Sequence, residues 1–449
     1  KKKNTMRPSN VGILAIEVYI PTTYVDQADL EVYDKAGKGK YTKGLGQQQM
    51  AVVSDLEDVN SIACTVVARL LEKNHINPHD IGRIEVGTET ILDKAKSTKT
   101  VLMNLFSELG NKNIEGITSL LACYGCTQAL FNSAAWVESS AWDGRLSIAV
   151  ASDIAVYDKG NARATGGAGA IAILVGPNAP IVLEPIRTSC FENAYDFYKP
   201  IPNSEYPLVD GHHSIDCYLD SVTHSYELYV RKTGLRSVSD LADYFAFHVP
   251  FAGMARKAFT RMIYDDVRLN PNAHGTLGEL AKTQTLDMKD RTIATQFQNY
   301  SEELWQTRAS PSLKLGSMIG NIYTGSLYLS LVSLLIDPSI DILGKKISMF
   351  SYGSGLAATL FTLQVRPEAA HALAQIKQNC SLDSIFGSRL KLTPEEYSRR
   401  MDQREIDFNR PNYIPSDSLS ELRSGTFYLV RVDDRWRRFY TRKQTHSKL

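Results

Sequence analysis

Three side chains in this sequence could carry nucleophilic catalysis: Cys123, Glu89 and His248. Cys123 comes just before a segment that is typical of a helix, where unpaired backbone N–H groups and the helix dipole favour a thiolate. Glu89 and His248 each stand at the end of a short apolar run that is typical of a strand. Partial burial there raises the pKa of a carboxyl group toward that of a working acid or base. Together these groups predict a cysteine nucleophile with polar partners.

Each of these residues also has an ordinary structural interpretation. A cysteine is more often a small buried apolar residue than a nucleophile, and a single Glu or His at a strand end is more often structural. Cys126 completes a C-x-x-C pair with Cys123, a spacing found in zinc and thioredoxin-like sites. The sequence has no second pair and no His at ligand spacing, so we predict no metal site.

Two glycine-containing motifs are set aside on their context. Residues 167–172 satisfy G-x-G-x-x-A, but they lead into a strand-like segment and do not open a helix, which argues against dinucleotide binding. Residues 351–355 resemble a nucleophile elbow without its G-x-S-x-G spacing. Their glycines are better interpreted as allowing backbone amides to approach a ligand oxygen.

The elements that must position these residues occur twice, in the same order. A strand-like run, a small-residue turn opening a helix, and a strand–glycine turn–strand unit appear in each half of the chain. The segments are 83–89, 128–138, 146–151, 166–169 and 170–175 in the first half, and 244–248, 323–335, 347–350, 353–355 and 357–365 in the second. This repetition predicts an α/β fold of two similar βαβ-rich halves, with a site between them.

Four further segments lie outside this repeat. Residues 198–218 and 271–311 fit neither half, and we interpret them as insertions over the site or as a subunit contact. Residues 392–410 are charged and predicted to be helical, and residues 425–440 are predicted to form an edge strand or hairpin.

Composition excludes several classes of function. The 449 residues are 43% hydrophobic, which is typical of a globular protein. With 50 basic and 49 acidic residues, the net charge of +1 gives no overall field that attracts nucleic acid or an anionic membrane. No apolar run reaches the ~18 residues of a membrane span. The six cysteines suggest no disulfide framework, so we expect a cytoplasmic protein in a reducing compartment.

The sequence also carries a long ordered set of uncommon strings. They are Gly39–Thr42 with Gly44–Gln47, Glu85–Thr90, Ala122–Gly125, Ser139–Arg145, Ala194–Pro200, Ser204–Pro207, Phe247–His248, Gly320–Asn321 and Phe350–Leu356. From about residue 7 to residue 442 the chain resembles the eukaryotic-type hydroxymethylglutaryl-CoA synthases of the thiolase superfamily, as a divergent member.

This resemblance implies a thiolase-like fold with a layered α/β/α/β/α core. Residues 8–185 would form the half with the nucleophile and the general acid/base, and residues 186–442 the half with the substrate-positioning His and Asn and the insertions. The implied reaction condenses acetyl-CoA with acetoacetyl-CoA and water to give 3-hydroxy-3-methylglutaryl-CoA and CoA, in the mevalonate pathway of isoprenoid synthesis. It implies a homodimer that uses CoA thioesters as substrates, with no metal, cofactor, nucleic acid or membrane partner.

The resemblance also implies a role for each matching residue. Cys123 accepts the acetyl group, and Glu89 acts as base and acid. His248 and Asn321 hold the acetoacetyl group, and backbone N–H groups at Cys123 and Ser354 polarise the thioester oxygen. The remaining matches line the acyl pocket (Asp153, Tyr157, Asp196, Phe197), contact the product (Asn161, Thr165, Ser214) or meet CoA (Lys40, Lys257).

Five departures from the family pattern leave alternatives open. Leu121 replaces an Asn, Cys126 a Gly, Ala164 a Pro, Cys190 a His and Gly253 a CoA-contacting Lys. One alternative is a specialised or non-catalytic paralogue with altered acyl-CoA use. Another is a different thiolase-class condensing enzyme. That class needs a second catalytic Cys or two His partners, whereas here one Glu and one motif His accompany the Cys.

Overall fold

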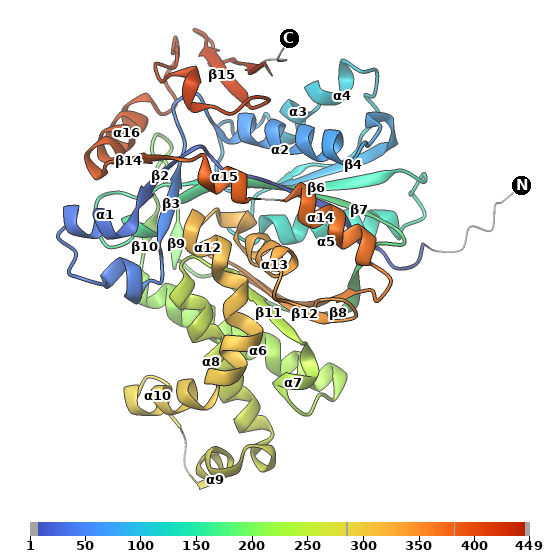
Figure 1. The fold of residues 1–449 in the computed structure, drawn as a ribbon, viewed down its shortest axis with the longest axis vertical. Helices are drawn as coiled ribbons and strands as arrows, with labels where there is room; N and C mark the ends of the chain where they lie inside the picture. Colours follow the sequence, from blue (N-terminus) through green and yellow to red (C-terminus); the bar gives the residue numbers. More distant parts are fainter. Residues whose placement is uncertain (1–7, 284–285, 381, 445–449) are drawn as a thin grey trace, which may run out of the picture.

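The computed structural model describes residues 8–283, 286–380 and 382–444, and its central feature is a nine-stranded sheet (Figure 1). The strands lie in the order β11-β12-β13-β8-β1-β7-β6-β4-β5. Their bounds are β1 Gly12–Tyr19, β4 Ile81–Gly87, β5 Thr118–Ser119, β6 Leu146–Ala155, β7 Gly167–Gly176, β8 Ile181–Phe191, β11 Tyr244–Phe247, β12 Lys346–Gly353 and β13 Ala357–Val365.

The strand directions repeat in the two parts of this sheet. In the first part β4 is parallel to β6, which is antiparallel to β7, which is antiparallel to β1. In the second part β11 is parallel to β12, which is antiparallel to β13, which is antiparallel to β8. The two parts join where β1 meets β8 over a short antiparallel stretch at Gly12 and Ile13. The predicted duplication is therefore confirmed. The predicted boundary at residues 185–186 falls inside β8.

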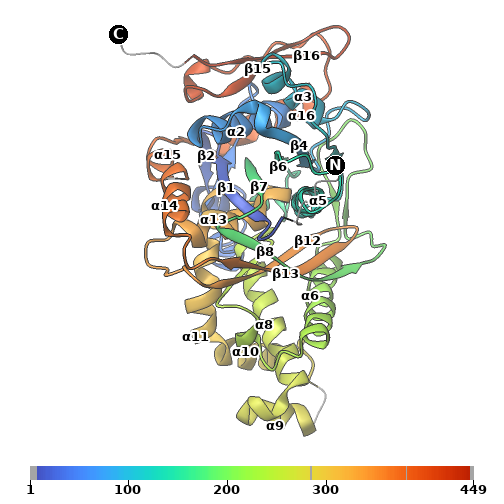
Figure 2. The same ribbon diagram turned by 90° about the vertical axis from the view of Figure 1, so that its right-hand side faces the viewer.

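Helices alternate with the two half-sheets to give five layers (Figure 2). Helix α2 (Val59–Lys73) covers β1, β6 and β7 on one outer face. Helices α5 (Gly125–Val137) and α13 (Ser326–Ile336) lie between the half-sheets. Helix α6 (Gly211–Thr233) covers β8, β12 and β13 on the other outer face, and helix α8 (Ala252–Leu269) packs on β11 there through Phe259. This is the α/β/α/β/α core expected from the sequence.

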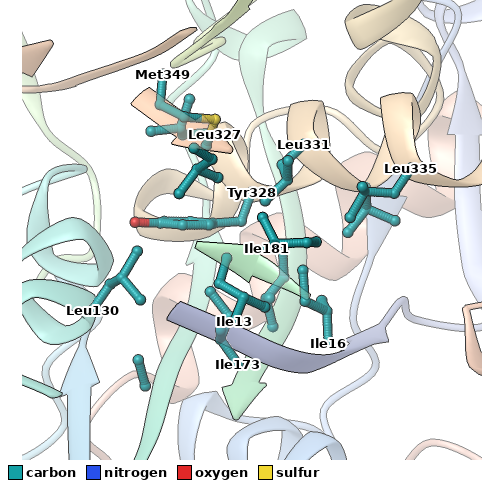
Figure 3. Close-up of a cluster of buried hydrophobic side chains, with 14 of the residues drawn as sticks. Ile13, Ile16, Leu130, Ile173, Ile181, Leu327, Tyr328, Leu331, Leu335 and Met349 are labelled. Atoms are coloured by element: carbon teal, nitrogen blue, oxygen red, sulfur yellow. The ribbon is translucent and has the colours of Figure 1, made fainter. Parts of the chain in front are cut away.

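The middle layer is where the halves share a core. Helix α13 is apolar nearly all round, and its leucines and Tyr328 pack against strands of both halves (Figure 3). The side chains labelled there are Ile13, Ile16, Leu130, Ile173, Ile181, Leu327, Tyr328, Leu331, Leu335 and Met349. A helix buried on every side suits such a sequence, because no face of it needs water. The two halves are thereby held in one packed unit.

The predicted glycine turn at residues 166–169 is wrong, because β7 already begins at Gly167. The glycine has a different purpose. A Cβ atom on Gly167 would lie 2.5 Å from the carbonyl oxygen of Asn321, and Gly167 pairs with Gly320 in an isolated bridge. Glycine at this point therefore lets the second half's loop pass directly against the first half's strand.

The segments outside the repeat form separate structures. The predicted C-terminal helix is α16 (Pro394–Asp407), and the predicted hairpin is formed by β15 (Phe427–Val432) and β16 (Arg438–Arg442). Within residues 271–311, α9 (Gly275–Thr283) and α10 (Arg291–Tyr300) extend away from the sheet (Figure 1), while residues 284–285 lie outside the described residues. The subunit-contact interpretation of this segment stays a prediction.

The remaining strands and α-helices are smaller. They are β2 Thr23–Asp26, β3 Gln49–Val52, β9 Phe197–Tyr198, β10 Leu208–Val209, β14 Leu390–Leu392, α1 Gln27–Tyr33, α3 Thr98–Leu102, α4 Asn104–Ser107, α7 Val238–Leu241, α11 Glu302–Leu304, α12 Lys314–Ile319, α14 Ala370–Asn379 and α15 Asp383–Gly387. None of the helices in the described part of the chain is long and apolar enough to cross a membrane.

Candidate active site

Cys123 and Glu89 meet where two elements of the first half end. Strand β4 ends at Gly87, two residues before Glu89, and helix α5 begins at Gly125, two residues after Cys123. The Cys123 Sγ donates a hydrogen bond to Glu89 Oε2 over 3.5 Å. Glu89 is only 7% exposed. The structure therefore brings the two predicted groups into direct contact.

The protonation state of Cys123 differs from the expectation. Burial raises the pKa of the thiol well above its usual value, and the charges of Glu89 and Asp153 raise it further. These effects outweigh the helix N-terminus that favours a thiolate. In the free protein Cys123 is therefore a thiol, and Glu89 Oε2 is the acceptor to which it donates.

Asp153 braces the loop that carries Glu89. This fully buried residue of β6 accepts hydrogen bonds at Oδ1 from the backbone N–H groups of Glu89 (2.9 Å) and Thr90 (3.1 Å), and at Oδ2 from the N–H of Thr324 (3.2 Å). The hydroxyls of Thr88, Thr90 and Thr324 also donate to it. Burial and the charge of Glu89 raise the pKa of Asp153 to about 6. Asp153 thus ties Glu89 to a loop of the other half.

An aromatic cluster lies beside the nucleophile. Tyr157, Phe197 and Tyr323 make mutual edge-to-face contacts, with ring centroids 6.0 to 6.4 Å apart. Cys123 packs against this cluster. The cluster combines residues of both halves, and it gives the thiol apolar surroundings that suit a small acyl group.

His248 directly follows strand β11 of the second half and is 2% exposed. The Tyr218 ring stacks on the imidazole with centroids 6.5 Å apart, and the Tyr218 hydroxyl donates to the His248 carbonyl over 2.7 Å. Burial lowers the pKa of His248 to about 3, so the ring is neutral at physiological pH. Burial raises the pKa of Tyr218 well above its usual value, and a thiolate at Cys123 would raise it further.

Asn321 is held with its amide in one orientation. Its Oδ1 accepts hydrogen bonds from the Tyr323 N–H and the Ser326 hydroxyl, both at 2.8 Å. Because both bonds use the oxygen, the Nδ2 group is the one suited to donate to a ligand. The loop that carries Asn321 is the one that lies directly against Gly167 of β7.

Ser354 stands in the turn between β12 and β13, and two contacts hold this turn against the nucleophile. A Cβ atom on Gly353 would lie 2.6 Å from the backbone nitrogen of Tyr124, so only glycine permits this approach. The buried Asp196 accepts hydrogen bonds from the Gly355 N–H (2.9 Å) and the Tyr352 hydroxyl (2.7 Å). Asp196, like Asp153, therefore accepts hydrogen bonds that hold a loop of the protein in place.

The other predicted binding residues lie further out. Lys40 is exposed, and its Nζ donates to Asn161 Oδ1 over 2.9 Å. The Thr165 hydroxyl donates to the Ala162 carbonyl, and Ser214 is half-buried in the first turn of α6. Lys257, on α8, lines a groove of about 750 Å³. The groove also presents three further cationic side chains, Lys43, Arg256 and Lys314.

The five departures occupy structurally different places. Cys126 and Ala164 are fully buried, and Cys190 is buried in β8. Leu121 is half-buried, and its carbonyl accepts a hydrogen bond from the N–H of Tyr124. Gly253 lies in the first turn of α8 and lines the cationic groove. None of the five residues takes part in the contacts described above that join Cys123, Glu89 and Asp153.

Three residues that contact the site were not predicted as site residues. Lys199 forms an ion pair with Glu89, Tyr323 belongs to the aromatic cluster beside Cys123, and the Thr324 N–H donates to Asp153. Lys199 belongs to the string Ala194–Pro200. Tyr323 and Thr324 come shortly after the string Gly320–Asn321, with only Ile322 between. Their position beside predicted site residues was the only hint in the sequence of a role in the site. Their contacts join segments that are far apart in the sequence, so these contacts depend on the fold.

Comparison with known families decides the relationship. A model of the hydroxymethylglutaryl-coenzyme A synthase N terminal domain matches residues 7–180, and a model of the C terminal domain matches residues 181–443. The chain belongs to the hydroxymethylglutaryl-CoA synthase family. The second family model begins where β8 begins, at residue 181.

Individual members of this synthase family match over nearly the whole chain. The cytoplasmic hydroxymethylglutaryl-CoA synthase of Homo sapiens is 45% identical, over 98% of this chain and 88% of that protein. The mitochondrial synthase of Sus scrofa is 46% identical, over 97% of this chain and 90% of that protein. Among solved structures, MvaS in complex with 3-hydroxy-3-methylglutaryl coenzyme A is 31% identical, with a TM-score of 0.84 over 98% of this chain and 100% of that one.

Proposed function

We propose that this protein condenses acetyl-CoA with acetoacetyl-CoA and water to give 3-hydroxy-3-methylglutaryl-CoA and CoA, through an acetyl-Cys123 intermediate. The observation that carries the proposal is the contact of 3.5 Å between Cys123 Sγ and Glu89 Oε2 beside an aromatic cluster. Membership of the synthase family supports the same reaction, and so does the structural similarity to MvaS bound to 3-hydroxy-3-methylglutaryl coenzyme A.

The first half supplies the bond-making groups. The Cys123 sulfur attacks the acetyl-CoA carbonyl, its proton ends on the departing CoA sulfur either directly or through Glu89, and CoA leaves as the free thiol with Glu89 again a carboxylate. Glu89, as a carboxylate, then removes a proton from the acetyl methyl group, and the resulting carbanion attacks the ketone carbon of acetoacetyl-CoA. Glu89 returns the proton to the new alkoxide. Water hydrolyses the Cys123 thioester, which frees the product carboxylate and restores the thiol.

The second half positions the acceptor. His248 is neutral, so it hydrogen-bonds to the acetoacetyl group without adding charge, and Asn321 Nδ2 donates to the same group. Backbone N–H groups at Cys123 and Ser354 polarise the thioester oxygen, since Gly353 brings the Ser354 turn against the nucleophile's backbone. Tyr157 and Phe197 enclose the acyl group.

The outer residues bind the rest of each substrate. Lys40 and Lys257 meet the anionic part of CoA, and the groove cations around Lys257 extend that surface. Asn161, Thr165 and Ser214 contact the product. The reaction uses CoA thioesters as substrates and requires no metal or cofactor.

We also propose a cytoplasmic homodimer in the mevalonate pathway. Strand β5 is an edge of the central sheet, and the neighbouring side chains of Ile117 (59% exposed) and Leu120 (61% exposed) project apolar surface. An unpaired edge with apolar flanks suits a second copy of the chain. Light scattering after size-exclusion chromatography tests this, and a mass of one chain at micromolar concentration would contradict it.

The condensation is tested by product analysis. The protein is incubated with acetyl-CoA and acetoacetyl-CoA, and mass spectrometry follows both thioesters, free CoA and 3-hydroxy-3-methylglutaryl-CoA. We expect product and free CoA to appear in equal amounts, and neither with Cys123→Ala. Release of free CoA without the six-carbon acyl product would show thioester hydrolysis and contradict the proposal.

A further inference from the structure

Lys199 and Cys123 contact different oxygens of the Glu89 carboxylate. Lys199 follows strand β9, in the segment interpreted from sequence as an insertion over the site. Its Nζ lies 3.1 Å from Glu89 Oε1, whereas the Cys123 thiol lies 3.5 Å from Oε2. The two oxygens of one carboxylate are therefore engaged by two different groups, and both partners of the ion pair are largely shielded, with side chains 19% and 4% exposed.

Aromatic faces help to hold the ammonium in this place. Lys199 Nζ lies 4.3 Å from the centroid of the Tyr323 ring and 5.7 Å from that of Phe197. A cation at such distances is attracted by the negative face of an aromatic ring. The aromatic cluster beside Cys123 therefore also contacts the Lys199 ammonium group that pairs with Glu89.

We propose that Lys199 is a positioning residue that holds the ionised Glu89 carboxylate with Oε2 toward Cys123 and thereby sets the pH range of the condensation. This inference rests on the proposed function, since it assigns a partner to the group proposed as base and acid. Lys199 itself acts through Glu89 and needs no contact with the reacting atoms.

The charges around Glu89 explain why a cation matters there. The groups facing it are the Cys123 thiol, the Asp153 carboxylate and the hydroxyls of Tyr157 and Tyr323. Burial raises the pKa of each of these groups, and the charge of Glu89 raises it further. Lys199 acts in the opposite direction and lowers the pKa of Cys123. Without it, a thiol and two carboxylates face one another in a buried site. Cys123 should then keep its proton to higher pH, because a nearby positive charge favours the ionised form of an acid.

The test compares three variants. Lys199→Met removes the charge and keeps the length of the side chain, and Lys199→Arg keeps the charge. Lys94→Met removes a charge from an exposed lysine that lines the same cavity of about 350 Å³ as Glu89 and Lys199. For each protein we measure kcat of condensation against pH, and the rate of Cys123 alkylation by iodoacetamide against pH.

We expect Lys199→Met to move the acidic limb of kcat and the alkylation midpoint upward by about one pH unit or more. Lys199→Arg should restore most of this shift, and Lys94→Met should match wild type. A folded Lys199→Met protein with both wild-type pH profiles overturns the inference. If Lys199→Met does not fold, Lys199→Gln is judged on the same profiles.

The alkylation readout needs no substrate, so it separates this inference from the proposed function. A wild-type protein that never forms acetyl-Cys123 contradicts the function, while the alkylation midpoints still decide whether Lys199 sets the protonation of the site. An active wild type with unshifted Lys199→Met midpoints contradicts only the role of Lys199.

Discussion

The Cys123 thiol donates to Glu89 Oε2 over 3.5 Å, and the charge of the same carboxylate raises the pKa of that thiol. Glu89 therefore affects Cys123 in two opposite ways: it can accept the proton, and it opposes the thiolate. Removing Glu89 takes away an acceptor for the thiol's proton but also makes the thiolate easier to form. In condensation, by contrast, Glu89 has only the favourable role of base and acid.

Glu89→Ala should separate the two steps. We expect Cys123 still to be acetylated, because the two effects on the thiol oppose each other, while condensation falls by at least ~10²-fold, the usual scale of a lost general base. Single-turnover transfer from labelled acetyl-CoA measures the first step, and steady-state product formation measures the second. An equal loss in both steps would mean that Glu89 is structural.

His248→Ala should impair the second substrate most. We expect a large rise in KM for acetoacetyl-CoA or a large fall in its kcat, and a smaller effect on acetylation of Cys123. Because burial lowers the pKa of His248 to about 3, its ring resonances should not titrate between about pH 5 and pH 9. Histidine-selective NMR, with His248→Ala to assign the signal, measures this. A midpoint near the ordinary histidine value would contradict the buried neutral ring.

Asp153→Asn should destabilise the protein and slow condensation. Backbone N–H groups donate to both carboxylate oxygens, from Glu89 at Oδ1 and from Thr324 at Oδ2, and backbone groups cannot turn away. An asparagine NH₂ group must therefore face an N–H donor in either orientation, at a cost of about 1–3 kcal/mol. Denaturant unfolding measures the loss, with exposed Asp158→Asn as the matched control. Equal stability of the two variants would refute the bracing role.

The repeat was readable from sequence because each half carries its own local pattern. Strand runs ending near Glu89 and His248, and the apolar helix after Asn321, follow from periodicity, and the structure has them as β4, β11 and α13. Gly167 was misassigned because a glycine next to other glycines resembles a turn. Glycine is needed there because the backbone of Asn321, more than a hundred positions away in the sequence, lies directly against it.

The site's electrostatics were less accessible to sequence. The pKa of Cys123 depends on burial and on Glu89 and Asp153, which only the fold brings near it. The contact of Lys199 with Glu89 likewise spans distant segments. Residue type and spacing predicted the groups, while their protonation and their supporting contacts required the three-dimensional arrangement.

Gly253→Lys should strengthen binding of the CoA thioesters. The backbone of Gly253 is not in the left-handed region, and a Cβ atom would lie 3.0 Å from the Gly44 carbonyl oxygen, so a small local shift accommodates it. The new cation would join Lys43, Arg256, Lys257 and Lys314 around the groove. A screened contact with phosphate contributes on the order of 1 kcal/mol, so KM should fall several-fold at low salt with kcat little changed.

Gly253→Ser controls for the steric change, because it adds a side chain without charge. The gain from lysine should shrink as ionic strength rises. Thermal melting is measured beside the kinetics for both variants. An unchanged melting temperature with no salt-sensitive fall in KM for Gly253→Lys would refute the missing-contact interpretation.

Acetylation of Cys123 tests the central claim most directly. The protein is incubated with isotopically labelled acetyl-CoA alone, quenched in acid, digested, and its peptides are analysed by mass spectrometry. The account predicts label on the peptide that contains Cys123, and none in folded Cys123→Ser, since an alcohol cannot supply a thiolate. Label that persists in Cys123→Ser, or a folded and substrate-binding wild type whose Cys123 peptide carries none, would contradict it.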